Sequence, residues 1–119
     1  MGLPRAHRLK HWRDFQAVYS HGRVYRSRSL TLRRLPAPKD ETTPARIGIA
    51  VGRSVSKRAV VRNRLKRRLR AALRPLLPRL HPGDRLVFSL RPPAVECEYE
   101  HFLRELNQVL TQAEVLDGH

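Results

Sequence analysis

The residues best suited to chemistry in this chain are the cations of the stretch VVRNRLKRRLR, which spans residues 60–70 and holds six Arg or Lys side chains. Guanidinium and ammonium groups donate hydrogen bonds to phosphate oxygens, so they indicate the binding of a polyanion. At about 100° per residue, a helix over this stretch separates an apolar arc from a cationic arc. The apolar arc holds Val61, Leu65, Leu69, Ala72, Leu73 and Leu76. The cationic arc holds Asn63, Arg64, Lys66, Arg67, Arg68, Arg70 and Arg74.

Two further arginines, Arg58 and Arg62, project toward the apolar arc or its edge on the same helix. Their aliphatic stems can lie along the core while the guanidinium heads reach the start of the helix or the edge of a sheet. We therefore interpret Arg62 as a structural residue as well as a contact to the polyanion.

The cationic arc opposes folding by itself. Like charges three or four residues apart on a helix repel, and each pair costs roughly a few tenths of a kcal/mol. Arg64, Arg67 and Arg68 form such a set, and no Asp or Glu occurs from residue 42 to residue 83. A phosphate backbone would reverse the sign of this energy, whereas a face that serves only solubility is the alternative. We favour the phosphate backbone.

Residues for catalysis by the protein itself are scarce. Cleavage of a phosphodiester needs clustered acids for two metal ions or a pair of histidines for acid–base work. The basic two thirds of the chain offers only Asp14, Asp40 and Glu41. His7 and His11 have the i, i+4 spacing of metal ligands, but they lie near the N-terminus, where a helix would fray. We expect no catalytic residue and no metal site in this chain.

Charge dominates the composition. The 119 residues carry 25 Lys and Arg against 10 Asp and Glu, for a formal net charge of +15. Residues 1–39 have ten cations and one acid, residues 40–83 have twelve and two, and residues 84–119 have three and seven. We therefore expect the first two thirds to form the binding surface, with an acidic C-terminal helix kept away from it. Arg supplies 21 of the cations, which suits phosphates and bases, although a codon bias would give the same preference.

The cysteine content and the short apolar runs of the sequence indicate the cellular compartment. Cys97 is the only cysteine, so no disulfide forms within the chain and a reducing compartment fits. The apolar runs are too short to span a membrane, and the basic N-terminus is not followed by the apolar stretch of a signal peptide. We expect a cytoplasmic protein that does not bind membranes, with residues 1–119 as a single domain.

The elements that must position the cations follow from hydrophobic periodicity. In chain order they are a helix at 9–21, a strand at 23–35, an exposed loop at 36–45, a strand at 46–53, the basic helix at 57–74, a strand at 84–91, a helix at 96–114 and a tail at 115–119. The loop has a length that suits a hairpin-like connection. Three or four strands with helices on one side predict an α+β fold, a two-layer α-β sandwich.

Two of these elements carry unusual patterns. In the strand at 46–53, Gly48, Ala50 and Gly52 leave one face nearly bare, so either a packed helix or a ligand approaches closely there. In the helix at 9–21, aromatic residues recur at helical spacing at Trp12, Phe15 and Tyr19. We interpret Trp12 as core or surface packing.

The segment RIGIAVGRSVSKRAVVRNRLKRRLRAAL resembles the signature of the bacterial ribonuclease P protein subunit family. The match centres on Arg62-Asn63-Arg64 followed by Leu65-Lys66-Arg67, and Arg46-Ile47-Gly48 with Val51 resembles the strand before it. Leu9-Lys10, Asp14-Phe15, Val18-Tyr19 and Gly22 match the first helix of that family. The resemblance covers roughly residues 5–114.

The resemblance implies a fold like domain 2 of ribosomal protein S5, with a left-handed βαβ crossover that opposes the usual right-handed rule. It implies a monomeric protein that binds one catalytic RNA, the ribonuclease P RNA, and helps it to remove the 5′ leader from precursor tRNA. The RNA would hydrolyse the phosphodiester with divalent metal, usually Mg²⁺, held through the RNA and the substrate rather than bound tightly by the protein.

The resemblance also implies roles for individual residues. The contacts to the RNA subunit would be Arg53, Lys57, Arg58, Arg62, Asn63, Arg64, Lys66, Arg67 and Arg68. Phe15 and Tyr19 match aromatic positions that face the leader, and bases stack on such rings with little sequence preference. Aromatic residues four apart on a short helix are also typical of a core, so both interpretations of Phe15 and Tyr19 stay open.

The chain departs from the family pattern in one place that bears on function. Residues 53–57, RSVSK, lack the Lys-Lys pair common after the strand and offer Arg53 and Lys57 instead. Two other functions compete with the resemblance. One is a ribosomal or ribosome-assembly protein that only coats RNA, and the other is a protein-only nuclease, which the scarcity of acids disfavours.

Overall fold

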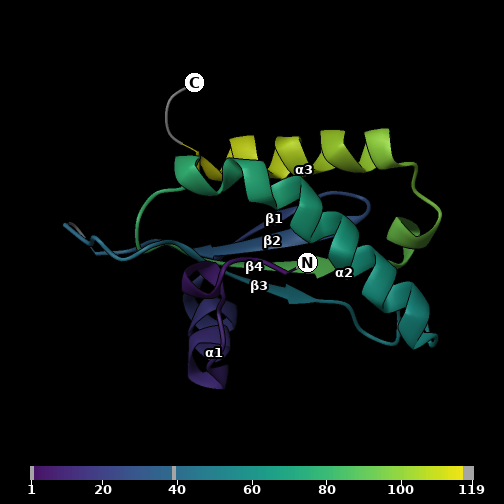
Figure 1. Ribbon diagram of the computed structural model, residues 1–119, viewed down its shortest axis with the longest axis horizontal. Helices are drawn as coiled ribbons and strands as arrows, with labels where there is room; N and C mark the ends of the chain where they lie inside the picture. Colours follow the sequence, from purple (N-terminus) through teal and green to yellow (C-terminus); the bar gives the residue numbers. More distant parts are fainter. Residues whose placement is uncertain (1, 39, 117–119) are drawn as a thin grey trace.

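The computed structural model describes residues 2–38 and 40–116, which form three α-helices and a four-stranded sheet (Figure 1). The elements are α1 (Trp12–His21), β1 (Arg23–Arg26), β2 (Leu30–Leu35), β3 (Arg46–Ala50), α2 (Ala59–Leu73), β4 (Arg85–Leu90) and α3 (Tyr99–Ala113). Short 3-10 helices are η1 (Arg5–His7), η2 (Arg74–Arg79) and η3 (Pro92–Val95). The α+β class and the three predicted helices are confirmed.

The strand order in the sheet is β1-β2-β4-β3. β1 pairs with β2 and β2 with β4 in antiparallel fashion, whereas β3 and β4 are parallel and are joined through α2. The last strand in the sequence therefore lies between β2 and β3. The predicted hairpin-like connection over residues 36–45 is wrong, because this loop joins strands that are not neighbours.

The single strand predicted over residues 23–35 is two strands, β1 and β2, joined by a tight turn. The backbone N–H of Ser27 donates to the carbonyl of Leu30 at 2.9 Å, and the Ser27 hydroxyl donates to the same carbonyl at 3.1 Å. The turn brings Arg26 opposite Thr31. The prediction failed because side-chain alternation does not mark the residue at which a chain reverses.

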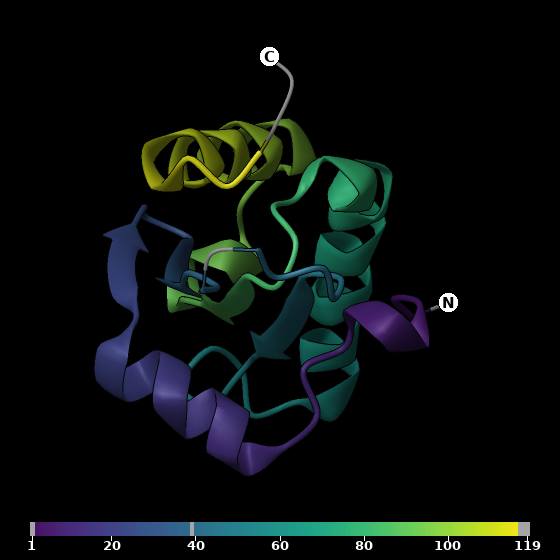
Figure 2. The same ribbon diagram turned by 90° about the vertical axis from the view of Figure 1, so that its left-hand side faces the viewer.

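The helices lie on both faces of the sheet (Figures 1 and 2). The main core is enclosed between the sheet and the helices α2 and α3, and its buried members include Leu32, Phe88, Leu65, Leu69, Phe102 and Leu106. A smaller cluster lies under α1 and consists of Leu9, Val18 and Val87, with Phe15 and Leu35 packed against it. The prediction of a two-layer sandwich with helices on one side of the sheet is therefore wrong in one respect. Helix α1 packs on the opposite face of the sheet and adds a partial third layer.

Helix α1 is held on the sheet by Val18 and Phe15. Val18 is completely buried, and a Cβ atom added to Gly48 of β3 would collide with the Phe15 ring. The absent side chain therefore lets the ring approach the backbone of β3. The structure assigns the bare face of this strand at Gly48 to a packed helix, whereas Gly52 is exposed and a Cβ atom added there would meet only ordinary contacts with Ser54, 3.8 Å from its hydroxyl.

Helix α2 packs through the predicted apolar arc. Leu65, Leu69, Ala72 and Leu73 are buried, and the half-buried Val61 packs against the same core. The helix passes into η2, which contains Pro75 and Pro78, where the sequence predicts its end.

The loop over residues 36–45 and the C-terminal segment are both tied to the fold. Asp84 is 2% exposed and accepts a hydrogen bond from Arg34 Nε at 2.8 Å and one from the Ala37 backbone N–H at 3.3 Å. In the segment predicted as a tail, Val115 is buried and Leu116 forms a β-bridge with Leu80, whereas residues 117–119 lie outside the described residues.

The β1–β2 turn is fastened to α3 by Glu105. One carboxylate oxygen accepts the backbone N–H of the buried Ser29 at 2.7 Å, and the other accepts its hydroxyl at 3.0 Å. Burial of the Glu105 carboxylate raises its pKa, but the hydrogen bonds from Ser29, Ser27 and Cys97 together outweigh burial and hold the pKa below the ordinary value. The charged form is therefore the one that stabilises the turn.

This shift predicts a loss of stability in acid. The unfolded chain binds the Glu105 proton more readily than the folded chain, so the stabilisation is complete above the ordinary pKa of 4.5 and is lost as the pH falls through the lower, folded value. Urea unfolding at a series of pH values should show a smaller acid-induced loss for Glu105→Gln than for the wild type. The exposed Glu100→Gln is the control, and equal acid sensitivity of wild type and Glu105→Gln would contradict this role.

Candidate nucleic-acid interface

The outer side of α2 carries most of the predicted contact residues. We call the side chains of Asn63, Arg64, Lys66, Arg67, Arg68 and Arg70 the α2 basic surface. Asn63, Arg64 and Arg67 are exposed, and the other three are half-buried. Because the opposite arc of α2 is anchored in the core, a rigid helix presents these donors to solvent.

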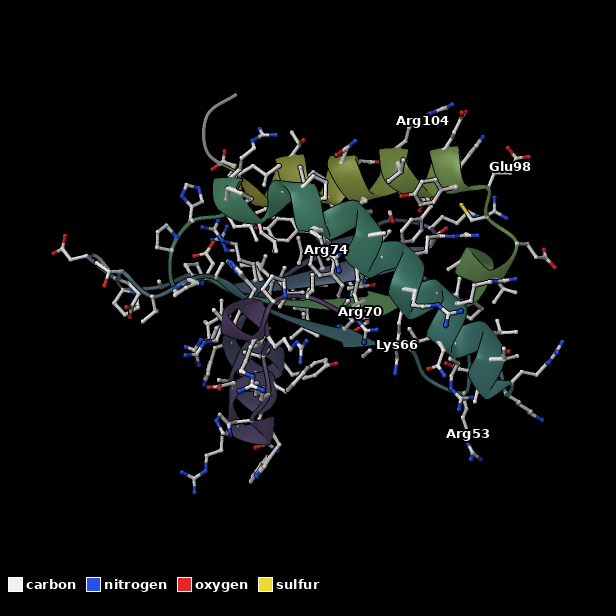
Figure 3. The ribbon with its side chains drawn as sticks, in the orientation of Figure 1. Arg53, Lys66, Arg70, Arg74, Glu98 and Arg104 are labelled. Atoms are coloured by element: carbon white, nitrogen blue, oxygen red, sulfur yellow. The ribbon has the colours of Figure 1, made fainter. Side chains whose placement is uncertain are left out.

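In the part of the chain that the structure describes, no acid forms an ion pair with this surface. Within residues 2–38 and 40–116, one ion pair joins Arg34 to Asp84 at 2.8 Å and another joins Arg85 to Asp14 at 3.5 Å. Neither pair includes a member of the α2 basic surface. Helix α3 is a neighbour of α2 rather than remote from it, as Figure 3 shows, but in the described residues its carboxylates form no ion pair with α2.

The start of α2 adds more uncompensated positive charge. Arg58 is the N-cap residue, no side chain caps the helix, and the first turn holds no acid. Lys57 and Arg58 are exposed beside the positive end of the helix dipole. An acid would be favourable at this position, and the exposed backbone N–H groups suit an anion such as phosphate.

Two of the predicted contacts also hold the fold together. Arg62 Nη1 donates to the Ser56 carbonyl at 2.9 Å, so its head reaches the start of the helix as expected. Arg68 Nη1 donates to the Cys97 carbonyl at 3.2 Å, and its guanidinium lies 5.7 Å from the centroid of the Tyr99 ring. Arg62 and Arg68 thus use part of their hydrogen-bonding capacity within the protein, whereas Arg64 and Arg67 make no hydrogen bond or ion pair with the described residues.

A cavity of about 430 Å³ lies between α2, β3 and the N-terminal segment. Arg8, Lys10, Phe15, Gly48, Ile49 and Arg70 are among the residues that line it. Lys66 and Arg70 project from the same side of α2 (Figure 3). Arg53 is exposed in the loop that precedes α2. The cavity joins the α2 basic surface to α1, which the sequence did not indicate.

The sheet face that carries α1 brings further cations beside the aromatic residues. The strand register aligns Val24, Arg33, Val87 and Gly48 in one row, and Arg26, Thr31, Ser89 and Ala50 in the next. The Arg33 guanidinium lies 4.8 Å from the centroid of the Tyr19 ring. Hydrophobic periodicity did not identify Arg26 and Arg33 as candidate site residues, because their position beside α1 depends on the turn and on the pairing of β1 with β2.

The aromatic residues of α1 differ in their surroundings. Phe15 is half-buried, packs against the small cluster under α1 and lines the cavity, so it takes part in the core and is also accessible. Tyr19 is 47% exposed and Trp12 is 65% exposed, so neither is a core residue.

In the part of the chain that the structure describes, no group of three or more His, Cys, Asp or Glu side chains could hold a metal ion. No helix among the described residues is long and apolar enough to cross a lipid bilayer.

Comparison with known proteins gives one consistent family. Residues 3–114 match the profile of the family described as Ribonuclease P. The ribonuclease P protein component of Picosynechococcus sp. is 55% identical over 119 residues, and that of Microcystis aeruginosa is 53% identical over 120 residues, with each pair covering 100% of both chains. The structure of the Staphylococcus aureus RNase P protein superposes with a TM-score of 0.83 at 26% identity, covering 95% of this chain and 100% of that one.

The uncompensated charge of α2 predicts that a charge reversal stabilises the fold. A glutamate at position 67 would have Arg64 three residues before it and Arg70 three residues after it, which turns two repulsive pairs into attractive ones. Arg67→Glu should raise the free energy of unfolding by about 1 kcal/mol in urea titrations at low salt.

The matched control is Arg104→Glu on α3, which places a second acid four residues after Glu100 and should lower the free energy of unfolding. An equal gain for both variants would show that net charge, rather than the α2 basic surface, is responsible.

Proposed function

Because the chain belongs to the ribonuclease P protein family, the protein component of a tRNA-processing endoribonuclease, we propose that its α2 basic surface binds the catalytic RNA and that its α1 side holds the 5′ leader of precursor tRNA. The observation that carries this proposal is the set of cations on α2 that no carboxylate in the described residues neutralises. A folded RNA supplies the missing negative charge.

We assign RNA contact to the surface and to the residues that lead into α2. The proposed contacts are Arg53, Lys57, Arg58, Arg62, Asn63, Arg64, Lys66, Arg67, Arg68 and Arg70. Among them, Arg64 and Arg67 are available for RNA, since they are exposed and make no hydrogen bond within the described residues. Arg62 and Arg68 would contact RNA with the donors left over from their bonds to backbone carbonyls.

The leader is proposed to cross the face of the sheet beside α1. Phe15 and Tyr19 offer rings on which single-stranded bases stack, and Arg33 lies over the Tyr19 ring. The neighbouring row holds Arg26 beside the short side chains of Thr31, Ser89 and Ala50, so it offers a further cation to the phosphates of the strand. Stacking of this kind has little sequence preference, which suits leaders of different sequence.

Hydrolysis is assigned to the RNA rather than to this chain. The proposed interface is rich in guanidinium groups, which cannot coordinate a cation, and no described cluster of acids or histidines stands near it. Mg²⁺ is therefore proposed to be held by the RNA and the substrate phosphates. The chain contributes by binding the substrate and by offsetting the electrostatic repulsion between the catalytic RNA and the precursor tRNA.

Several finer expectations stay predictions. They are the single domain over residues 1–119, a monomer bound one-to-one to the RNA, a cytoplasmic location and the left-handed hand of the β3–α2–β4 crossover. The parallel pairing of β3 with β4 supports a βαβ unit, whose hand a superposition on domain 2 of ribosomal protein S5 would test.

Reconstitution tests the proposed role. Mixed with ribonuclease P RNA and precursor tRNA at low Mg²⁺, the chain should accelerate release of the leader over RNA alone, because its cations replace part of the screening by metal. The chain without RNA should release none. No acceleration by the chain would reject the assisting role, and cleavage without RNA would favour a protein-only nuclease.

Phe15 tests the leader site. Phe15→Ala should weaken the binding of precursor tRNA by about 1–3 kcal/mol in filter-binding titrations and leave mature tRNA unaffected. Because Phe15 also packs against Gly48, Phe15→Leu serves as the control that keeps apolar volume without the aromatic face. An equal loss of affinity for both RNAs would assign Phe15 to the core alone.

A further inference from the structure

Trp12 is an aromatic residue that the fold leaves unused. It is the first residue of α1, the only tryptophan of the chain, and 65% exposed, more than any other large apolar side chain among the described residues. Its indole makes no hydrogen bond and no ring contact in that part of the chain. Helix α1 is anchored by Val18 and Phe15 instead, so the folded state gains little from the indole.

The position of Trp12 continues a line of rings along α1. Trp12 and Tyr19 are seven residues apart, which places them within about 20° of each other around the helix axis. Phe15 lies three residues from one and four from the other, so it neighbours both. The three side chains therefore share one side of α1.

The spacing of the three rings along α1 allows one base to stack on each ring. At a rise of about 1.5 Å per residue, successive rings are separated along the axis by about 4.5 and 6 Å. These separations exceed the rise of about 3.4 Å between stacked bases of a duplex. A strand that follows the rings must have its bases splayed apart, which is how single-stranded RNA is held on aromatic side chains.

The charges around Trp12 favour the binding of a polyanion. Lys10 and Arg13 are exposed on either side of it. The only acid of α1, Asp14, is paired with Arg85 at 3.5 Å. A second copy of this chain would bring further cations against Lys10 and Arg13, which disfavours self-association at this site.

We propose that Trp12 is a third base-stacking residue for the leader and extends the site of Phe15 and Tyr19 beyond the edge of β3. The inference rests on the proposed leader site. Phe15 and Lys10 line the cavity at this edge, whose far side carries Arg70 of the α2 basic surface. The leader would thus run from the sheet face past Trp12 toward the RNA bound on α2. Trp12 should matter only for leaders long enough to reach it.

The sole tryptophan makes the test direct. The holoenzyme reconstituted with ribonuclease P RNA carries one indole, so its emission reports on Trp12 alone. Precursor tRNA with a long leader and a non-cleavable linkage should quench this emission, and mature tRNA should not. Trp12→Ala should weaken binding of the long-leader precursor by roughly 5- to 150-fold and leave mature tRNA unchanged. Trp12→Phe should retain most of the affinity.

Tyr99→Ala removes an exposed aromatic residue on α3, away from α1, and serves as the control that should not distinguish the two RNAs. If Trp12→Ala binds both RNAs like the wild type while Phe15→Ala still discriminates between them, the inference fails and the proposed leader site stands. If neither variant discriminates, the leader site itself fails. Emission that changes with protein concentration alone would assign Trp12 to self-association and overturn the inference.

Discussion

Uncompensated positive charge on a firmly packed helix is the constraint on which the other features of this protein depend. The apolar arc of α2 is buried in the main core, so the helix cannot rotate its cations away from one another. The ion pairs Arg34–Asp84 and Arg85–Asp14 lie elsewhere. Packing thus holds together a surface that electrostatic repulsion opposes, and we propose that the RNA supplies the counter-charge.

The architecture places two kinds of binding chemistry next to each other. Cations dominate α2, and exposed or half-buried rings dominate one side of α1, although the two helices lie on opposite faces of the sheet. They meet at the edge of β3, where Phe15 and Arg70 line the same cavity. Gly48 makes this meeting possible, because any side chain there would displace the Phe15 ring. The proposed sites for a folded RNA and for a single strand are therefore neighbours.

The sequence predicted those parts of the fold that local patterns determine. Periodicity located α2 and α3, Pro75 marked the end of α2, and the bare face at Gly48 indicated a close approach. Pairing and layering could not be predicted in this way, because alternation says nothing about which strand is the neighbour or which face a helix covers. The turn at Ser27, the insertion of β4 between β2 and β3, and the location of α1 were missed for this reason. Of the candidate site, the run of charge revealed the α2 residues, whereas Arg26 and Arg33 became visible only through the strand register.

The salt dependence of RNA binding tests the central claim most directly. Association constants of the ribonuclease P RNA complex would be measured over a series of KCl concentrations for the wild type and for the double variant Arg64→Ala with Arg67→Ala. If both guanidiniums neutralise RNA phosphates, the slope of log association constant against log salt should become less steep by about 1.4–1.8. An unchanged slope would show that these exposed cations do not meet the RNA, and the account built on α2 would be contradicted.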